Sequence, residues 1–309
     1  MRKRIHFNDV VARDGFQMEP EFVPTDDKVR LIDRLSACGL AKIEVTSFTS
    51  ARAIPMLRDA EAVFGRIRRK PGMVYTALVP NLRGAERAME AGVDELNVVV
   101  SISESHNLAN LRMSRQRSLG EIAEILRFAT GCARNPRITV SLSTAFGCPI
   151  EGDVDVEEVI RWADSLADLG VGSFTVCDTT GVAHPAQVES LSHVLLKRFP
   201  AMPLTMHFHD TRGMGLANVA AAARAGIASF DGSLGGLGGC PYAPGASGNI
   251  CTEDAVHMLE AMGYDTGVDL DALLTVAREL PGIVGHDISS HLVKAGTTAK
   301  PRAPCQALH

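Results

Sequence analysis

The chain repeats one pattern, in which a helical stretch ends at a glycine and a short β-rich run begins a few residues later. The pattern is clearest at Gly39, Gly92, Gly170 and Gly226. Glycine at the C-terminal end of a helix relieves left-handed strain, and a short loop then leads into the next strand. Together with four further β-rich runs, the pattern predicts eight strands, at residues 5–11, 42–47, 73–79, 95–100, 138–143, 173–177, 204–209 and 228–232.

Eight strands, each followed by a helical segment, favour an α/β fold of the (β/α)8 TIM-barrel type. The alternative, an open doubly wound sheet, normally uses fewer strands, and no G-x-G-x-x-G follows the first strand here. We expect a single domain at residues 1–295 with a C-terminal helical extension, and a mobile tail at residues 296–309. Helix starts are expected near Thr25, Asn81 and Pro185, where caps, acidic first turns or an early proline occur.

The composition excludes several classes of protein. The chain has 309 residues, of which 46% are hydrophobic, so a large core is available. The net charge of −5 argues against a nucleic-acid partner. We expect no signal peptide and no membrane-spanning segment. Seven scattered cysteines without a C-x-x-C pair indicate free thiols in a reducing, cytoplasmic location.

Two histidines lie on the same face of one predicted strand. In the run 204–209, Leu204, Met206 and Phe208 alternate with Thr205, His207 and His209. Since strand side chains alternate in direction, His207 and His209 can both reach one metal ion. The alternative is a histidine pair without a metal, and on spacing alone this alternative is favoured.

Polar residues gather where other predicted strands end, which is where the active site of a barrel lies. Arg13 and Asp14 follow the first strand, although this pair can also be a surface turn. Glu44 and Thr46 face inward, and the buried carboxylate needs either a partner such as an arginine or a nearby cation. Asp178 follows the sixth strand and has capping of the next turn as its alternative role.

A glycine-rich run at residues 234–249 follows the eighth strand. Its six glycines and two prolines indicate a mobile lid that carries Cys240. The alternative is a phosphate-binding loop, but the run contains no lysine or arginine. Asn249 stands near the start of the next helix, so it is either a helix cap or a metal ligand through its amide oxygen.

Four of these residues form a set of nitrogen and oxygen donors without a thiolate. They are Asp14, His207, His209 and Asn249. Such a set favours Mg²⁺ or Mn²⁺ as the divalent metal cofactor, with Co²⁺ or Zn²⁺ as alternatives.

Over nearly its whole length, the chain resembles the 3-hydroxy-3-methylglutaryl-CoA lyase family of metal-dependent lyase and synthase barrels. The glycine-rich motif is the most specific part of the resemblance. The motifs that carry it are at residues 13–15, 43–48, 79–82, 146–149, 178–179, 207–211, 236–242 and 245–249.

The resemblance implies the ligand set named above, and we also assign a catalytic role to His207. It also implies that Arg13 stabilises an enolate and that Cys240 acts as acid or base. The implied reaction is a retro-Claisen cleavage of an acyl-CoA substrate to acetyl-CoA and a keto acid. In that reaction the metal lowers the pKa of the substrate hydroxyl, Arg13 neutralises the enolate and the thiol quenches it.

The resemblance further implies supporting roles for Glu44 and Asp178, and assembly into dimers or larger homo-oligomers. We assign Gln17, Thr46 and Ser103, together with Arg13, to substrate binding.

The chain departs from the family pattern after the fourth strand. Where relatives carry an aromatic residue and a lysine, it has His106, Asn107, Leu108 and Ala109. We expect a loop here whose smaller side chains widen the acyl or pantetheine channel, so that a bulkier acyl group is accepted. Phe16 and Met18 also replace the more usual Leu and Asn.

Three alternative functions remain. One is the same chemistry on another branched 3-hydroxyacyl-CoA. Another is a condensing enzyme of the isopropylmalate synthase type, but those enzymes generally carry His-x-His-Asn-Asp, whereas this chain has Asp210 and Thr211 after His209. The third is a non-catalytic metal-binding barrel.

Overall fold

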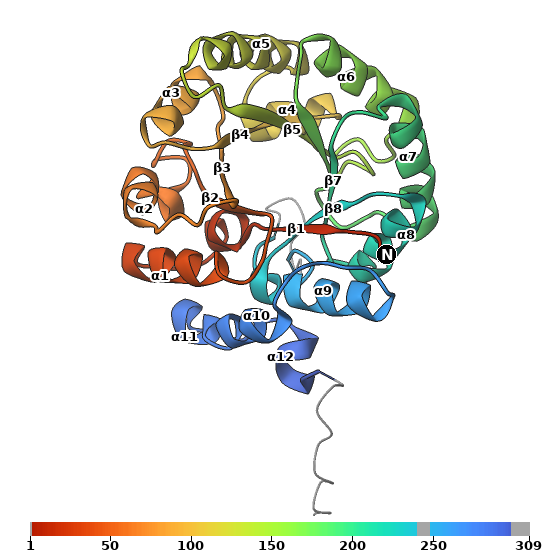
Figure 1. Cartoon of the computed structure of the whole chain (residues 1–309). Helices are drawn as coiled ribbons and strands as arrows, with labels where there is room; N and C mark the ends of the chain where they lie inside the picture. Colours follow the sequence, from red (N-terminus) through yellow and green to blue (C-terminus); the bar gives the residue numbers. More distant parts are fainter. Residues whose placement is uncertain (1, 240–247, 298–309) are drawn as a thin grey trace, which may run out of the picture.

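The computed structural model describes residues 2–239 and 248–297. These residues form a closed barrel in which each parallel strand pairs with the next and β8 returns to β1 (Figure 1). The predicted TIM-barrel fold is therefore confirmed. The strands are β1 (His6–Asp9), β2 (Lys42–Ser47), β3 (Val74–Leu78), β4 (Glu95–Ser101), β5 (Arg137–Ser143), β6 (Ser173–Asp178), β7 (Leu204–Phe208) and β8 (Ser229–Gly232).

Helices surround the barrel as an outer ring (Figure 1). The ring is made of α1 (Thr25–Leu35), α2 (Ala60–Arg66), α3 (Leu82–Glu90), α5 (Arg115–Gly131), α6 (Val156–Asp168), α7 (Pro185–Arg198), α8 (Gly215–Ala225) and α9 (Thr252–Ala261). The short helix α4 (Glu104–Leu111) lies inside this ring, beside β4. A C-terminal extension of α10 (Leu270–Ala277), α11 (Leu280–Val284) and α12 (His291–Ala295) packs beside α1 and α9. No helix in the described ranges is long and apolar enough to cross a membrane.

The sequence signals for helix boundaries are confirmed. The Asn81 side chain accepts a hydrogen bond from the Gly84 N–H and caps α3, and His184 caps α7 just before Pro185. The four glycines that close the repeated pattern all have positive φ, between 81° and 121°. Most of the predicted tail, residues 298–309, lies outside the described residues.

Two predictions about local structure are wrong. The first strand ends at Asp9 rather than residue 11, because Val11–Gly15 forms one π-helical turn in which Arg13, Asp14 and Gly15 all donate to the Val10 carbonyl. This turn redirects the chain toward the barrel mouth. The run after β4 is the helix α4 rather than a loop, and Ser103 caps it by accepting from the His106 N–H.

The outward face of β7 anchors that strand to the surrounding core. Leu204, Met206 and Phe208 are buried, and the ring centroid of Phe208 lies 5.8 Å from that of Phe146. Burying a side chain of this size stabilises the fold by about 1.5–3 kcal/mol. The predicted alternation is confirmed, so β7 presents Thr205 and His207 to the barrel interior.

Candidate metal centre and active site

A cavity of about 760 Å³ opens at the carboxyl ends of the strands. It is lined by predicted site residues, by Asp231 of β8, by part of α4 and by the segments that follow β2 and β3. These lining residues include Arg13, Asp14, Gln17, His207, His209 and Asp231.

Three predicted metal ligands converge in this cavity. One ligand atom from each of Asp14, His207 and His209 lies within 4.8 Å of the others. The Nε2 atom of each histidine is 3.9 Å from Asp14 Oδ2. The π-helical turn after β1 delivers Asp14, while β7 and the residue after it deliver the two imidazoles. All three side chains are buried, as a metal site that excludes water requires.

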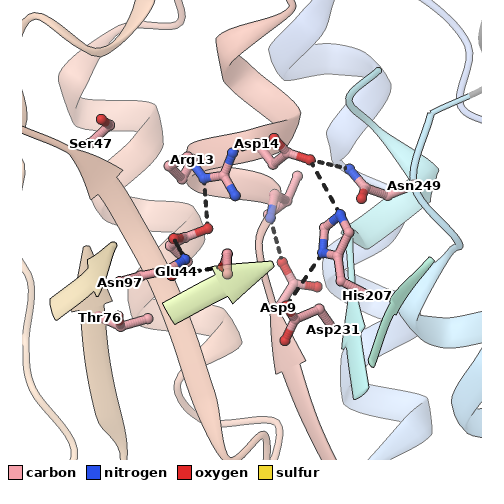
Figure 2. A network of polar contacts seen from close by, with 12 residues as sticks. Asp9, Arg13, Asp14, Glu44, Ser47, Thr76, Asn97, His207, Asp231 and Asn249 are labelled. Carbon is pink, nitrogen blue, oxygen red and sulfur yellow. Dashed lines mark hydrogen bonds and ion pairs between the residues drawn. The ribbon is translucent and has the colours of Figure 1, made fainter. Parts of the chain in front are cut away.

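Asn249 completes the arrangement. Its Nδ2 donates to Asp14 Oδ2 at 2.8 Å and to the Leu237 carbonyl at 3.0 Å, as Figure 2 shows for the first contact. Its Oδ1 is buried and has no hydrogen-bond partner among the described residues. The helix-cap alternative is not realised, because α9 begins at Thr252 with Cys251 as its N-cap. A buried amide oxygen left free beside a carboxylate and two imidazoles fits a divalent cation.

The protonation states of these residues favour metal binding. Burial opposes ionisation of Asp14, but the positive charge of Arg13 and the neighbouring imidazoles lower its pKa to about 2. Burial lowers the pKa of His209 to about 4, so its imidazole is neutral at physiological pH. Burial also acts against the charged form of His207, yet contact with Asp231 leaves its pKa raised. Asp14 and His209 therefore offer lone pairs without first losing a proton.

Arg13 is held beside the metal ligands by a chain of polar contacts. Its Nε donates to Glu44 Oε2 at 2.6 Å, and its Nη1 donates to Asp14. Glu44 accepts a second hydrogen bond from Asn97 Nδ2 at 2.8 Å (Figure 2). Ser141 donates in turn to Asn97 Oδ1 at 2.8 Å. Glu44 therefore has an arginine partner, as one of the two alternatives for it predicted. This ion pair fixes the guanidinium of Arg13 at the edge of the cavity.

Other predicted site residues lie outside the cavity lining. Asp178 accepts from the N–H groups of Val182 and Ala183 at 2.8 and 3.1 Å, which is the turn-capping role, and burial raises its pKa to about 6. Ser103 caps α4 and accepts from Cys148 Sγ at 2.9 Å. Thr46 is buried behind the lining. Their predicted roles in catalysis and substrate binding remain predictions.

Cys240 lies outside the described residues, but the base of its loop is described. At Gly238, which has a φ of +109°, an added Cβ would lie 2.5 Å from Asn249 Nδ2 and 3.1 Å from the Asp14 carbonyl oxygen. Only glycine allows the loop to approach the ligands this closely. Gly239, the residue before Cys240, lines the cavity.

Sequence reasoning missed Asn97 and Asp231. Both side chains point into the barrel, and each lies two residues from another inward side chain of its own strand. The two-residue alternation of side chains along a strand could therefore have indicated them. The arginines Arg52 and Arg112, which also line the cavity, carry no such signal.

Comparison with known proteins identifies the family. The HMGL-like family model matches residues 4–280, and the chain is 47% identical to a hydroxymethylglutaryl-CoA lyase of Bacillus subtilis over 93% of its length and 96% of the relative's. The chain belongs to the HMGL-like family. The resemblance inferred from the motifs is confirmed, and the match spans every predicted site residue from Arg13 to Asn249.

Two further relatives bear on the site. The structure of an HMG-CoA lyase from A. baumannii in complex with coenzyme A and 3-methylmalate superposes with a TM-score of 0.93, at 47% identity and 97% coverage of both chains. A 3-hydroxy-3-isohexenylglutaryl-CoA/hydroxymethylglutaryl-CoA lyase of Pseudomonas aeruginosa is 39% identical over 95% of this chain and 97% of its own.

Proposed function

We propose that this protein is a carbon–carbon lyase that cleaves a 3-hydroxy-3-methylglutaryl-CoA-type thioester to acetyl-CoA and acetoacetate. The observation that carries the proposal is the buried set of Asp14, His207 and His209 beside the free Oδ1 of Asn249. The set occurs in a chain that is 47% identical to a hydroxymethylglutaryl-CoA lyase. The fold alone would not support it, because TIM barrels host many chemistries.

Asp14, His207, His209 and Asn249 would hold a divalent metal ion. Their oxygen and nitrogen donors suit Mg²⁺ or Mn²⁺, with Co²⁺ or Zn²⁺ as alternatives. When bound, the cation supplies the Lewis acidity that lowers the pKa of the substrate's tertiary hydroxyl.

Arg13 stabilises the charge that develops during cleavage. Once the hydroxyl loses its proton, the C2–C3 electron pair moves onto the acetyl-CoA fragment as a thioester enolate, and the hydroxyl oxygen becomes the ketone of acetoacetate. The Arg13 guanidinium is held by Glu44 and needs no reorganisation to neutralise this enolate.

Cys240 is the proposed proton donor that converts the enolate into acetyl-CoA. Support comes from the close approach of Gly238 to Asn249 and from Gly239 in the cavity wall. A thiol that follows Gly239 in the chain is a suitable proton donor for the enolate.

Two arginines on the cavity rim suit the phosphates of coenzyme A. Arg52 and Arg112 are exposed and line the cavity. Within the described part of the chain, neither guanidinium has a hydrogen-bond or ion-pair partner. Free guanidinium groups bind phosphate oxygens through charge-assisted pairs of hydrogen bonds.

The acyl group can be larger than in 3-hydroxy-3-methylglutaryl-CoA. Four residues of α4 line the cavity, and two of them, Ala109 and Asn110, are small or polar. The Pseudomonas relative is named for an isohexenyl as well as a methyl substrate. We therefore keep cleavage of another branched 3-hydroxyacyl-CoA as the second candidate function.

We further propose a cytoplasmic homo-oligomer of two or more chains without a nucleic-acid or membrane partner. The net charge of −5 supports the absence of a nucleic-acid partner. Light scattering on the purified protein tests the oligomeric state.

Release of acetyl-CoA from 3-hydroxy-3-methylglutaryl-CoA tests the proposed function. Chelator-treated protein should be inactive and should recover when Mn²⁺ or Mg²⁺ is returned. A panel of branched 3-hydroxyacyl-CoA thioesters in the same assay separates the two candidate functions. Absence of cleavage of every thioester under metal-replete conditions would contradict the proposal.

A further inference from the structure

Asp231 contacts the imidazole of His207 from the side opposite Asp14. In the register of the sheet, His207 of β7 is the direct partner of Asp231 on β8. Asp231 Oδ2 lies 3.3 Å from His207 Nδ1, while His207 Nε2 faces Asp14 at 3.9 Å. The imidazole therefore lies between two carboxylates, as Figure 2 shows.

This contact determines which nitrogen of His207 is free. A carboxylate can only accept a hydrogen bond, so in the neutral imidazole Asp231 holds the proton on Nδ1 and leaves the lone pair on Nε2. Carboxylates that orient a histidine in this way typically raise metal affinity by 10- to 100-fold. We propose that Asp231 is a positioning residue that fixes the tautomer and ring orientation of His207 for metal binding; this rests on the proposed metal-dependent function.

The second histidine lacks such a support. His209 Nδ1 is buried and has no hydrogen-bond partner among the described residues. The backbone of His209 instead pairs with that of Asn249 in an isolated bridge. The two ligands are therefore unequal, and the contact with Asp231 belongs to His207 alone.

Asn8 on β1 holds Asp231 in place. Asn8 Nδ2 donates to Asp231 Oδ1 at 2.8 Å, so this oxygen must remain an acceptor. The orientation of an amide introduced at position 231 is then predictable. In Asp231→Asn, the amide oxygen stays with Asn8 and the NH₂ group faces His207 Nδ1, which drives the proton to Nε2 and blocks metal binding.

Exchanging the two side chains should reverse that effect. In the double variant Asn8→Asp with Asp231→Asn, the new carboxylate at position 8 accepts from the amide NH₂. The amide oxygen then faces His207 and accepts from Nδ1–H. The double variant keeps the net charge and the composition of the parent, so only the direction of the hydrogen bonds differs from the single variant.

The test is Mn²⁺ affinity of the full-length, metal-free protein, measured from the electron paramagnetic resonance signal of free Mn²⁺. We expect Asp231→Asn to weaken the Kd about 10- to 100-fold and the double variant to recover most of the loss. The control is Asp33→Asn on α1, whose side chain is 10% exposed against 13% for Asp231 and pairs with Arg68. It should change the Kd less than about twofold.

Thermal unfolding without metal shows whether each variant is folded, and the outcomes separate the two hypotheses. A parent protein that binds no Mn²⁺ would remove the proposed metal-dependent function. A parent that binds Mn²⁺ while Asp231→Asn binds it equally well would overturn only the role of Asp231. A double variant that binds Mn²⁺ as weakly as Asp231→Asn would also overturn the role of Asp231.

Discussion

Both ends of the barrel contain charged side chains, but the two ends use them differently. At the amino end, a cavity of about 510 Å³ is lined by residues including Arg4, Lys42, Glu95 and Arg137. Lys42 pairs with Glu95, which also accepts from Thr139, and Arg4 pairs with Asp265 outside the cavity. Three of these four charges are therefore in ion pairs, as expected where a barrel end serves stability.

At the carboxyl end, polar atoms are left available. The Oδ1 atom of Asn249 lacks a partner among the described residues, and the pKa values of Asp14 and His209 both lie below the usual range. Buried polar atoms without partners cost free energy. The carboxyl end therefore carries a cost that the amino end avoids, and a bound cation would offset it.

The largest effect is expected from removing a metal ligand. Asp14→Ala and His207→Ala should each lower kcat/KM by roughly 1,000-fold or more, because the cation contributes several kcal/mol to transition-state stabilisation. Acetyl-CoA release after chelation and metal resupply is the measurement. Near-parental activity in either variant would show that the ligand assignment is wrong.

A matched substitution at the amino end of the barrel tests whether the two ends have different roles. Glu95→Gln removes a buried ionic partner of Lys42 without touching the carboxyl-end cavity. It should lower the free energy of unfolding by about 1–3 kcal/mol and leave kcat unchanged within about twofold. Denaturant unfolding and the same turnover assay, run side by side, measure the two quantities.

The next largest effect is expected from replacing the arginine at the metal centre. Arg13→Lys should lower kcat by about 100- to 1,000-fold, since a lysine ammonium cannot keep the contacts to Glu44 and Asp14 while facing the enolate. Steady-state kinetics with Mn²⁺ present measures this. Full activity of the lysine variant would exclude a requirement for the planar guanidinium.

Cys240→Ser tests the proposed proton donor. It should retain substrate binding and lose about 100-fold in kcat, the usual scale for a positioned acid. Comparison of kcat with the Kd of a substrate analogue measures the two effects separately. An unchanged kcat would leave the thiol without a chemical role.

The buried acids of the carboxyl half should make stability depend on pH. Burial raises the pKa of Glu253 to about 7, and its carboxylate accepts from the Gly235 N–H at the base of the glycine-rich run. Because the native state then holds this proton more tightly than the unfolded state, the contribution of Glu253 to stability falls as pH rises from about 4.5 to about 7, by about 1–3 kcal/mol.

Glu253→Gln should flatten that dependence, since an amide keeps an acceptor for Gly235 and does not titrate. The free energy of unfolding of the metal-free protein, measured at several pH values in this window, checks the sign. The same slope of stability against pH in the parent and in the variant would contradict the assignment.

The smallest expected effect concerns the acyl group. Ala109 lines the cavity, whereas Leu108, its neighbour on α4, does not and is 49% exposed. Ala109→Phe should lower kcat/KM for a bulkier analogue about 5- to 100-fold relative to the methyl substrate, which corresponds to about 1–3 kcal/mol. Leu108→Phe is the matched control and should leave the ratio unchanged.

Local patterns sufficed to predict most of this architecture. Strand alternation placed His207 on the inward face, and glycines such as Gly170 marked the ends of helices. These signals act over a few residues. The π-helical turn that ends β1 was not predictable, because it depends on three N–H groups sharing the Val10 carbonyl.

Long-range contacts explain why other parts of the site could not be predicted from the sequence. The pairing of His207 with Asp231 follows from the register of β7 on β8, and the Asn249 contact to Asp14 joins residues 235 positions apart. No local pattern encodes either contact. The helical form of α4 does have a local signal, because Ser103 is a favourable N-cap residue.

The central claim is that the carboxyl-end cavity holds one metal ion on which carbon–carbon cleavage depends. Titration of Mn²⁺ into the metal-free protein, with bound metal and acetyl-CoA release followed in the same samples, tests it most directly. We predict that activity rises in proportion to bound Mn²⁺ and saturates near about one ion per chain. Full activity before any metal is added, or metal binding without a rise in activity, would contradict the claim.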